Sequence, residues 1–386
     1  DVTIKNDADG DVISIPTGTT NVTVAGNLTA TQFIGGGLNP YRNILINGDM
    51  SIAQRGTSTA SITTTGYHTI DRWNTTISAL GTWTQSQDTD VPTGQGFAKS
   101  LKMDNTTADA SPGASDYLNI RQYIEGQNLQ YLKKGTANAE SLTVSFWVKA
   151  TKTGTNIVEL RDNDNSRQIS KSYTVDSSDT WEQKEITFAG DTTGAFDNDN
   201  AASLTLLFWL AAGSNYTSGT LNTSWGASID ANRAVGQVNH ADSDSNNFWI
   251  TGIQLEVGTS ASDFEFLPYD VNLQRCLRYF EKIADGSEDA DAVISLGFVY
   301  QTNVISLPYK WSPKRTTPSI YQSSGTDYFR YQRDGGTEDF DSIKIYIPNY
   351  LNGLIYSDDN FTGTDDENGW VQINSSSAYL GLNAEL

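Results

Sequence analysis

Histidine and cysteine, which most often carry nucleophilic or zinc chemistry, are scarce in this sequence. Its 386 residues include one cysteine, Cys276, and two histidines, His68 and His240. Neither histidine lies near a G-x-S-x-G turn or a comparable catalytic signature, and one chain cannot assemble the usual four-ligand zinc sites. We interpret His68 as a strand residue and His240 as a polar loop residue, and we assign no catalytic residue.

Carboxylates are plentiful, so carboxylate catalysis and calcium binding both stay open. The chain has 46 Asp and Glu residues. The two carboxylates of a glycoside hydrolase are brought together only by folding, so the sequence does not identify such a pair. Acids and amides cluster at residues 162–165, 197–200, 242–244 and 358–360. None forms a complete calcium-binding loop, and β turns ordinarily contain Asp and Asn. We therefore interpret these clusters as solvated turns and expect no cofactor unless calcium binds.

Net charge excludes two classes of partner. The chain carries 25 Lys and Arg against 46 Asp and Glu, a formal net charge of −21, and its pI is near 4.3. Such a field repels the phosphates of nucleic acids and of anionic lipids.

The longest apolar run, residues 204–212, falls far short of the roughly 20 residues that span a bilayer. We expect neither nucleic-acid binding nor membrane insertion.

Aromatic residues are numerous and are the most informative part of the composition, with 9 Trp, 18 Tyr and 14 Phe. Exposed Trp and Tyr rings stack on sugar rings, while amides and carboxylates bind sugar hydroxyls. The aromatic residues of apolar strands, such as Trp147, Trp209 and Trp249, are assigned to the core. Five others lie in polar loops or near turns and are our candidate glycan contacts: Tyr216, Trp225, Tyr328, Tyr331 and Tyr356.

The order of elements along the chain indicates an all-β protein in three parts. Residues 1–37 contain short alternating segments separated by turns, with a glycine run at 35–37 that we interpret as a hinge. This strip has too little apolar surface to close a core alone, so we expect it to pair with other copies of the chain or with a neighbouring domain. The chain begins at Asp1 rather than Met, and we expect a trimmed or processed product.

Residues 38–269 show the spacing of a β-sandwich. In the segment 142–149, Leu142, Val144, Phe146 and Val148 share one face, as the period of a strand requires. Ten strand segments are expected: 43–46, 67–74, 82–86, 98–103, 117–123, 142–150, 157–161, 181–188, 202–210 and 247–254.

Residues 270–386 begin with the best helix pattern in the chain and then return to strands. Leu273, Leu277, Phe280 and Ala284 recur at spacings of four, three and four, which predicts a helix over 271–283. The same spacing suits the core positions of a coiled coil, so Leu273, Leu277 and Phe280 could line a threefold axis; a connector helix packed on its own domain fits equally well. A distal β domain is expected from the strand segments 292–300, 304–307, 319–322, 328–332, 342–347, 353–356 and 370–373.

Several ordered motifs resemble a module that recurs in phage and prophage tail fibres. They are residues 43–50 (NILINGDM), 54–56 (QRG), 71–73 (DRW), 253–258 (IQLEVG), 264–269 (FEFLPY), 273–280 (LQRCLRYF) and 383–386 (NAEL). Residues 23–30 look like the strip that precedes such modules. The resemblance covers roughly residues 39–283 and the terminus. It implies an extracellular virion protein, usually a homotrimer, anchored to a tail or baseplate protein and recognising a host-surface glycan or protein.

The segment Asn47-Gly48-Asp49 is also similar, more loosely, to the first strand of jelly-roll carbohydrate-binding modules, several of which hold a structural calcium. This resemblance makes Asp49 and Glu256 candidate calcium ligands, although Met50, Ser51 and Gln254 depart from the pattern. The residues themselves favour structural roles. Gly48 permits close backbone approach in a turn or bulge, and Arg72 suits a buried charge held by a carboxylate.

Together these observations predict an all-β homotrimer that attaches to host polysaccharide or lipopolysaccharide by multivalent, non-covalent binding. Its parts would be an N-terminal shaft or tail-anchoring segment (1–37), a jelly-roll sandwich (38–269) and a helix-led distal receptor-binding domain (270–386). Two alternatives stay open. One is a polysaccharide depolymerase, which would release new reducing ends from its substrate. The other is a carbohydrate-binding module of a secreted bacterial protein, which would be a soluble monomer.

Overall fold

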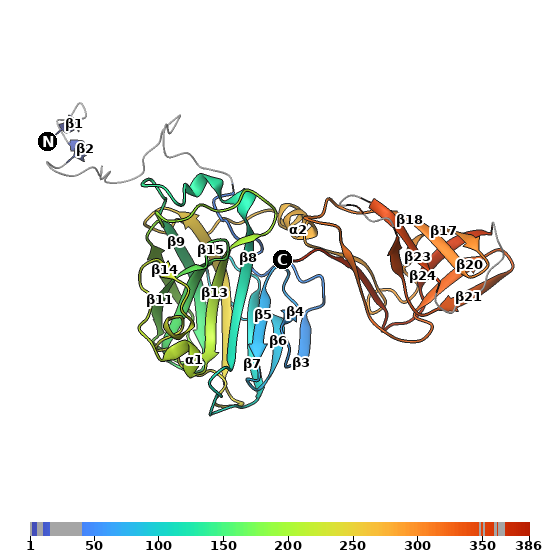
Figure 1. The fold of residues 1–386 in the computed structure, drawn as a ribbon, viewed down its shortest axis with the longest axis horizontal. Coiled ribbons are helices and arrows are strands. Elements are labelled where there is room, and N and C mark those ends of the chain that lie inside the picture. The colour runs from blue at the N-terminus through green and yellow to red at the C-terminus, as the bar shows by residue number, and fades with distance from the viewer. Residues whose placement is uncertain are drawn as a thin grey trace. The chain divides into compact units, whose positions relative to one another are not determined.

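The computed structural model describes residues 2–5, 11–15, 41–346, 349, 352–358, 361 and 367–386. The chain divides into two compact units, residues 1–41 and 42–386. In the first unit, β1 (Val2–Lys5) pairs antiparallel with β2 (Asp11–Ile15). The remaining expected segments of the N-terminal strip and the glycine run at 35–37 lie outside the described residues. The expectation of an all-β fold is confirmed (Figure 1).

The second unit contains a β-sandwich of two antiparallel sheets. The first sheet has the order β14-β11-β10-β13-β8-β5-β4. Its strands are β4 (Gly66–Tyr67), β5 (Asn74–Ser78), β8 (Tyr117–Glu125), β10 (Gly154–Asp162), β11 (Arg167–Val175), β13 (Ala202–Ala212) and β14 (Gly226–Ala227). The connections of the sandwich contain four short helices: η1 (Gly126–Asn128), η2 (Gln130–Leu132), α1 (Ser214–Thr217) and η3 (Asp230–Asn232).

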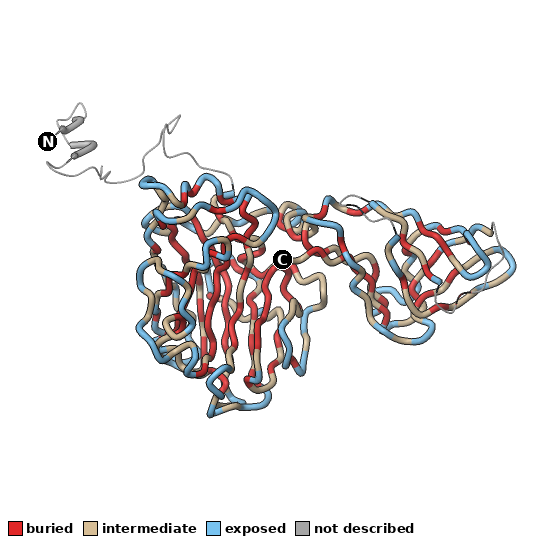
Figure 2. Tube along the Cα trace, in the orientation of Figure 1, coloured by how far each residue is buried: buried red, intermediate tan, exposed pale blue. Residues whose placement is uncertain are grey.

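The second sheet has the order β12-β9-β15-β7-β6-β3. Its strands are β3 (Ser58–Ile62), β6 (Thr82–Asp88), β7 (Ser100–Thr107), β9 (Leu142–Ala150), β12 (Glu182–Phe188) and β15 (Asn247–Val257). The apolar face expected from the alternation in 142–149 is confirmed, because Leu142, Val144, Phe146 and Val148 are all buried. Side chains from both sheets, among them Phe146 of β9 and Phe208 of β13, form one core. Figure 2 shows buried residues along the strands of both sheets.

Two of the expected strands are wrong. Residues 43–46 form no strand, because the Asn43 side chain takes the place of a ladder partner. Its Oδ1 accepts hydrogen bonds from the backbone N–H groups of Leu45 (3.1 Å) and Leu255 (3.0 Å). The expected strand 67–74 is interrupted between β4 and β5, where Arg72 adopts a positive φ of 72° that no strand accommodates. The expectation for Gly48 is confirmed, since a Cβ there would lie 2.0 Å from the carbonyl oxygen of Ile253.

The helix expected over 271–283 ends early. It spans α2 (Tyr269–Leu277), and the chain then enters strand β16 (Phe280–Asp285). The reason is tertiary: β16 pairs with β25 (Tyr379–Asn383), which also pairs with β19 (Ser319–Gln322) in a three-stranded sheet. Inter-strand hydrogen bonds therefore outweigh a helical pattern of under two heptads.

The remaining strands form the distal sheet, of order β21-β20-β24-β17-β18-β23-β22. Its strands are β17 (Val293–Gln301), β18 (Val304–Lys310), β20 (Phe329–Arg333), β21 (Gly336–Phe340), β22 (Lys344–Tyr346), β23 (Asn352–Ser357) and β24 (Asn368–Ile373). A second buried cluster, which includes Val299, Phe329 and Ile355, lies on one face of this sheet. None of the helices in the described part of the chain has the length and apolar character needed to cross a membrane.

His240 is not the polar loop residue that we expected, because its side chain is fully buried. Its Nε2 lies 2.7 Å from Asn156 Oδ1, and its ring packs edge-on against Phe248. Burial, with added repulsion from Lys152, lowers the pKa of His240 to about 4. The ordinary histidine pKa is about 6.5. His240 therefore stabilises the fold above about pH 6.5, and this contribution is lost as the pH falls through 4.

We expect an NMR titration of the His240 imidazole in the folded protein to give a midpoint near 4, because the buried ring resists protonation. The only other imidazole belongs to His68, so the variant His68→Gln assigns the signals. A midpoint for His240 of 6 or above would show that water reaches the ring and would contradict this prediction.

Candidate functional site

The five candidate glycan contacts fall into different environments, and one of them is removed from the set. Tyr331 on β20 is fully buried in the distal core. Its hydroxyl donates to the carbonyl oxygen of Glu367 at 3.1 Å, and its ring packs edge-on against Phe361. Strand alternation explains the placement, because Phe329 and Tyr331 point to the same covered face. Tyr331 is thus a core residue and cannot contact a glycan in the folded chain.

Trp225 and Tyr328 are half-buried and are held by the chain itself. Trp225 packs against the sandwich core, and its Nε1 donates to the carbonyl oxygen of Ala189 at 2.7 Å. The space it lines measures only about 20 Å³. Tyr328 packs against the distal core and closely over Gly325, where a Cβ would lie 2.2 Å from the tyrosine ring. Both rings have structural surroundings rather than an open binding surface.

Tyr356 lies in an open hollow on the other face of the distal sheet. The hollow measures about 430 Å³. The ladder brings its walls together, since Ser306 on β18 pairs with Phe298 on β17 and with Tyr356 on β23. On β22, Tyr346 packs edge-on against Tyr356 with ring centroids 6.1 Å apart. We call this feature the aromatic hollow, and its lining residues are Phe298, Tyr300, Gln301, Val304, Ser306, Tyr346, Leu354 and Tyr356.

Three rings of the aromatic hollow are unusually exposed. Tyr300 is 64% exposed, Tyr346 56% and Phe298 38%. The sequence pattern did not single them out, because they lie inside the expected strands 292–300 and 342–347 and the candidate contacts were sought in polar loops and near turns. The sequence does contain one indication of exposed apolar residues here. Residues 293–300 are apolar at nearly every position, whereas a strand covered on one face needs apolar residues only at every second position.

The lining of the aromatic hollow has the composition of a ligand-binding surface. The described lining contains no Asp, Glu, His, Cys, Lys or Arg, so tyrosine hydroxyls are its only groups able to act as general acid or base, and these residues supply no carboxylate for a metal. Gln301 and Ser306 supply polar groups among the aromatic rings. Aromatic walls with a few polar groups are typical of sites for small organic ligands, and a volume of about 300 to 1,000 Å³ is usual for them.

The residues expected to line a threefold axis do not form one stripe. Leu273 and Leu277 are half-buried on α2, whereas Phe280 lies on β16 and is fully buried. The buried face of α2 instead consists of Asn272 and Cys276. Because Phe280 is covered within its own chain, it cannot contact a partner in the folded protein. The homotrimer itself stays a prediction.

The two candidate calcium ligands are held by hydrogen bonds from the chain. Asp49 Oδ1 accepts from Asn272 Nδ2 (3.0 Å) and Ser51 Oγ (3.1 Å). Glu256 accepts from Gln254 Nε2 (2.9 Å) and from the backbone N–H of Ser262 (2.8 Å). Among the residues that the structure describes, no group of three Asp, Glu, His or Cys residues is placed to hold a metal ion. Calcium binding stays a prediction.

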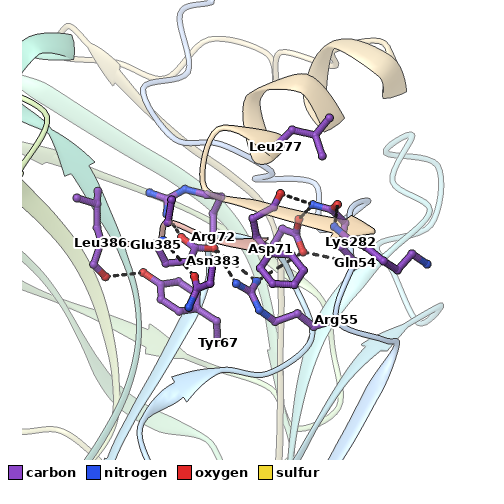
Figure 3. Close-up of polar contacts among 12 residues, drawn as sticks. Gln54, Arg55, Tyr67, Asp71, Arg72, Leu277, Lys282, Asn383, Glu385 and Leu386 are labelled. Atoms are coloured by element: carbon purple, nitrogen blue, oxygen red, sulfur yellow. Dashed lines mark hydrogen bonds and ion pairs between the residues drawn. The ribbon is translucent and has the colours of Figure 1, made fainter. Parts of the chain in front are cut away.

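The motif residues Arg55, Asp71, Arg72 and Glu385 meet in a buried cluster, which we call the ionic network (Figure 3). The Arg72 guanidinium is paired with the Glu385 carboxylate and donates to the carbonyl oxygen of Tyr123 at 2.7 Å. It also lies 3.4 Å above the centroid of the Tyr279 ring. The prediction that a carboxylate holds a buried Arg72 is confirmed, and the partner is Glu385 rather than the adjacent Asp71.

Arg55 and Asp71 complete the ionic network. Arg55 Nη2 lies 3.4 Å from Glu385 Oε1, and its Nη1 lies 3.9 Å from Asp71 Oδ1. Gln54 contacts Asp71 and also bonds the backbone of β16, donating to the Phe280 carbonyl at 3.0 Å. Burial raises the pKa of Asp71 to about 6, although Arg55 and the hydrogen bonds from Gln54 oppose the shift. These motif side chains therefore connect the sandwich to β16 and to residue 385, and they have structural roles.

Comparisons with known proteins show low overall similarity. No protein-family model matches the sequence, and no curated protein matches it. One solved structure with a related chain path is the enzymatically active domain of tailspike protein 4 of bacteriophage CBA120, at 16% identity and a TM-score of 0.30. The match covers 57% of this chain and 22% of the tailspike chain.

Two carbohydrate-binding modules are also similar in structure. A family 61 module solved with β-1,4-galactotriose matches 56% of this chain and 99% of its own, at 10% identity and a TM-score of 0.29. The family 11 module of Clostridium thermocellum, solved with a mixed-linked tetrasaccharide, matches 52% of this chain and 95% of its own, at 12% identity and a TM-score of 0.24. TM-scores of this size establish neither a shared family nor a shared ligand.

Proposed function

We propose that this chain is an adhesion protein that binds a glycan of a host surface through the aromatic hollow of its distal sheet. The observation that carries the proposal is the exposure of Phe298, Tyr300 and Tyr346 around Tyr356 in one hollow of about 430 Å³. Exposed aromatic rings gathered at one place mark an interaction site more often than scattered ones do. Sugar rings present apolar C–H faces that such rings cover, and Gln301 and Ser306 can bond the hydroxyls.

The setting that we propose is a phage tail fibre, and its support is the sequence motifs quoted above. Attachment would be non-covalent, since the described lining of the aromatic hollow has no acid or base beyond tyrosine. In a trimeric fibre three such hollows act together, so weak contacts add up to firm attachment. Light scattering tests the trimer, because three copies of a 42.1 kDa chain give a mass distinct from a monomer's.

The test of the glycan site is an array of bacterial surface polysaccharides probed with the full chain and with the variants Tyr300→Ala and Tyr346→Ala. Burying one aromatic ring against a ligand is worth about 1.5 to 3 kcal/mol. We therefore expect each variant to bind roughly ten- to a hundred-fold more weakly than wild type. Tyr131 on η2 is 49% exposed and far from the hollow in sequence, so Tyr131→Ala is the matched control and should bind like wild type.

Two outcomes would contradict the proposal. Equal loss of binding in Tyr131→Ala would show that the effect is not specific to the hollow. New reducing ends appearing when a bound polysaccharide is incubated with wild-type protein would show hydrolysis and move the depolymerase alternative to first place.

A further inference from the structure

A second cavity lies on the outer face of the sandwich, where β8, β10 and β13 are adjacent in the first sheet. It measures about 250 Å³. Alternation along β8 sends Leu118 and Ile120 into the core and leaves Asn119 and Arg121 on the cavity side. We call this feature the sandwich cavity, and its lining residues are Tyr117, Asn119, Arg121, Arg161, Trp209, Tyr216, Asp230 and Arg233.

The sandwich cavity is positively charged in an acidic protein. Three arginines and one aspartate line it, whereas the whole chain has a net charge of −21. Arg233 is neutralised, because its Nε lies 3.0 Å from Glu159 Oε1 and its Nη1 lies 3.3 Å from Asp230 Oδ1. Within the described ranges, Arg121 and Arg161 form no ion pair with any acid. Arg121 Nε donates to the neutral side chain of Asn74 at 3.4 Å, so the charges of both guanidinium groups are left for an anion from outside the chain.

Two buried polar atoms of the sandwich cavity also lack partners within the described chain. They are Nε of Arg161, a donor, and Oδ1 of Asn119, an acceptor. Asn119 is only 2% exposed, and buried polar groups are normally hydrogen-bonded. Burial and the charge of nearby Arg233 lower the pKa of Arg121, although tyrosines oppose the shift. An anion beside the arginines would relieve this repulsion, and a hydroxyl donor could satisfy Asn119.

Aromatic rings form the rest of the wall. The Tyr216 ring packs edge-on against Tyr117 with centroids 5.4 Å apart, and it lies 5.6 Å from the Trp209 ring. Tyr216, a candidate glycan contact in the sequence, therefore lies in this cavity and not in the aromatic hollow. An inorganic anion would leave both the ring surface and the Asn119 acceptor unused, because an anion such as sulfate donates no hydrogen bond.

We propose that the sandwich cavity binds an acidic sugar, whose carboxylate lies between Arg121 and Arg161, whose hydroxyl donates to Asn119 and whose ring lies beside Tyr216. Carboxylates are the natural partners of guanidinium groups, and such charge-assisted bonds are about twice as strong as neutral ones. The sandwich cavity is separate from the aromatic hollow, and the ligand proposed for it carries a negative charge.

Isothermal titration calorimetry of the full chain with sodium D-glucuronate tests the proposal. D-Glucose supplies a neutral sugar of similar size, while sodium acetate and sodium sulfate supply anions without a sugar ring. Of these four ligands, we expect only glucuronate to bind. Its affinity should fall about tenfold or more in Arg121→Gln or Arg161→Gln. Added salt should also weaken its binding. The control Arg330→Gln removes an arginine paired with Asp339 on the distal sheet and should leave the affinity unchanged.

Thermal unfolding separates a binding role from a structural one. Arg161 has no ion pair in the described chain, so Arg161→Gln should leave the melting temperature unchanged or raise it by relieving like charge. Three results would overturn the proposal: unchanged glucuronate affinity in both arginine variants, equal binding of glucose, or equal binding of acetate or sulfate. Tyr300→Ala should retain glucuronate binding, so this test fails or succeeds independently of the aromatic hollow.

Discussion

Replacing Glu385 with alanine is expected to lower the free energy of unfolding by about 3 to 5 kcal/mol, because it leaves buried guanidinium groups without their carboxylate. Glu385 is paired with both Arg72 and Arg55, and the three side chains are between 1% and 4% exposed. Asp71 gives Arg55 a second partner at 3.9 Å, but Arg72 has no other acidic partner in the described part of the chain. Urea unfolding of the full protein measures the change.

A matched control is Glu288→Ala on the surface. Glu288 is paired with one cation, Lys282, and its side chain is 65% exposed. Exposed pairs contribute about 0 to 1 kcal/mol. Glu385→Gln should give an intermediate loss, since the amide can still accept a hydrogen bond from Arg72. If Glu385→Ala cost no more than Glu288→Ala, the ionic network would not hold the fold together.

The second large effect is expected at Lys134, whose ammonium group is almost completely buried among acids. Its Nζ lies 2.5 Å from Asp162 Oδ2 and 3.1 Å from Asp191 Oδ2, and it donates to the carbonyl oxygen of Gly194 at 2.7 Å. Lys134→Ala removes the cation from Asp162, whereas Asp191 keeps Arg167 at 2.7 Å. We expect a loss of about 3 to 5 kcal/mol in urea unfolding.

The neighbouring Lys133 provides the comparison. It is paired with Glu140 on the surface, where the two side chains are 53% and 34% exposed, so Lys133→Ala should cost less than about 1 kcal/mol. The double variant Lys134→Met with Asp162→Asn should recover part of the loss, because it removes the unpaired charge together with its partner. A double variant less stable than Lys134→Ala would show that packing rather than charge explains the effect.

Strand alternation was enough to predict the sandwich but not every element of it. Strand β9 was predicted with its observed bounds, because its apolar residues alternate. Strand β11 (Arg167–Val175) was missed, since a polar run such as Lys171-Ser172 gives no apolar period. β16 was mistaken for helix, because its identity depends on pairing with Tyr379–Asn383, a contact that no local pattern contains.

The candidate site was predictable only in part, for a similar reason. Sequence alternation shows which residues of one strand share a face, but it does not show which face of a sheet is covered. The structure buries Tyr331 and leaves Tyr356 in an open hollow. Likewise the sequence indicated that Arg72 needs a carboxylate, while the choice of Glu385 among 46 acids required the fold.

The pairing of Arg72 with Glu385 also has a consequence for synthesis on the ribosome. The two residues are 313 positions apart, and at 5 to 20 residues per second about 15 to 60 s pass between their appearance. During that interval the sandwich strands have been synthesised, whereas the carboxylate that pairs with Arg72 has not. We therefore expect the ionic network, and with it the final packing of the sandwich, to form only after residue 385 has emerged. Pairing between residues this far apart in sequence slows folding, because the loop between them must close first.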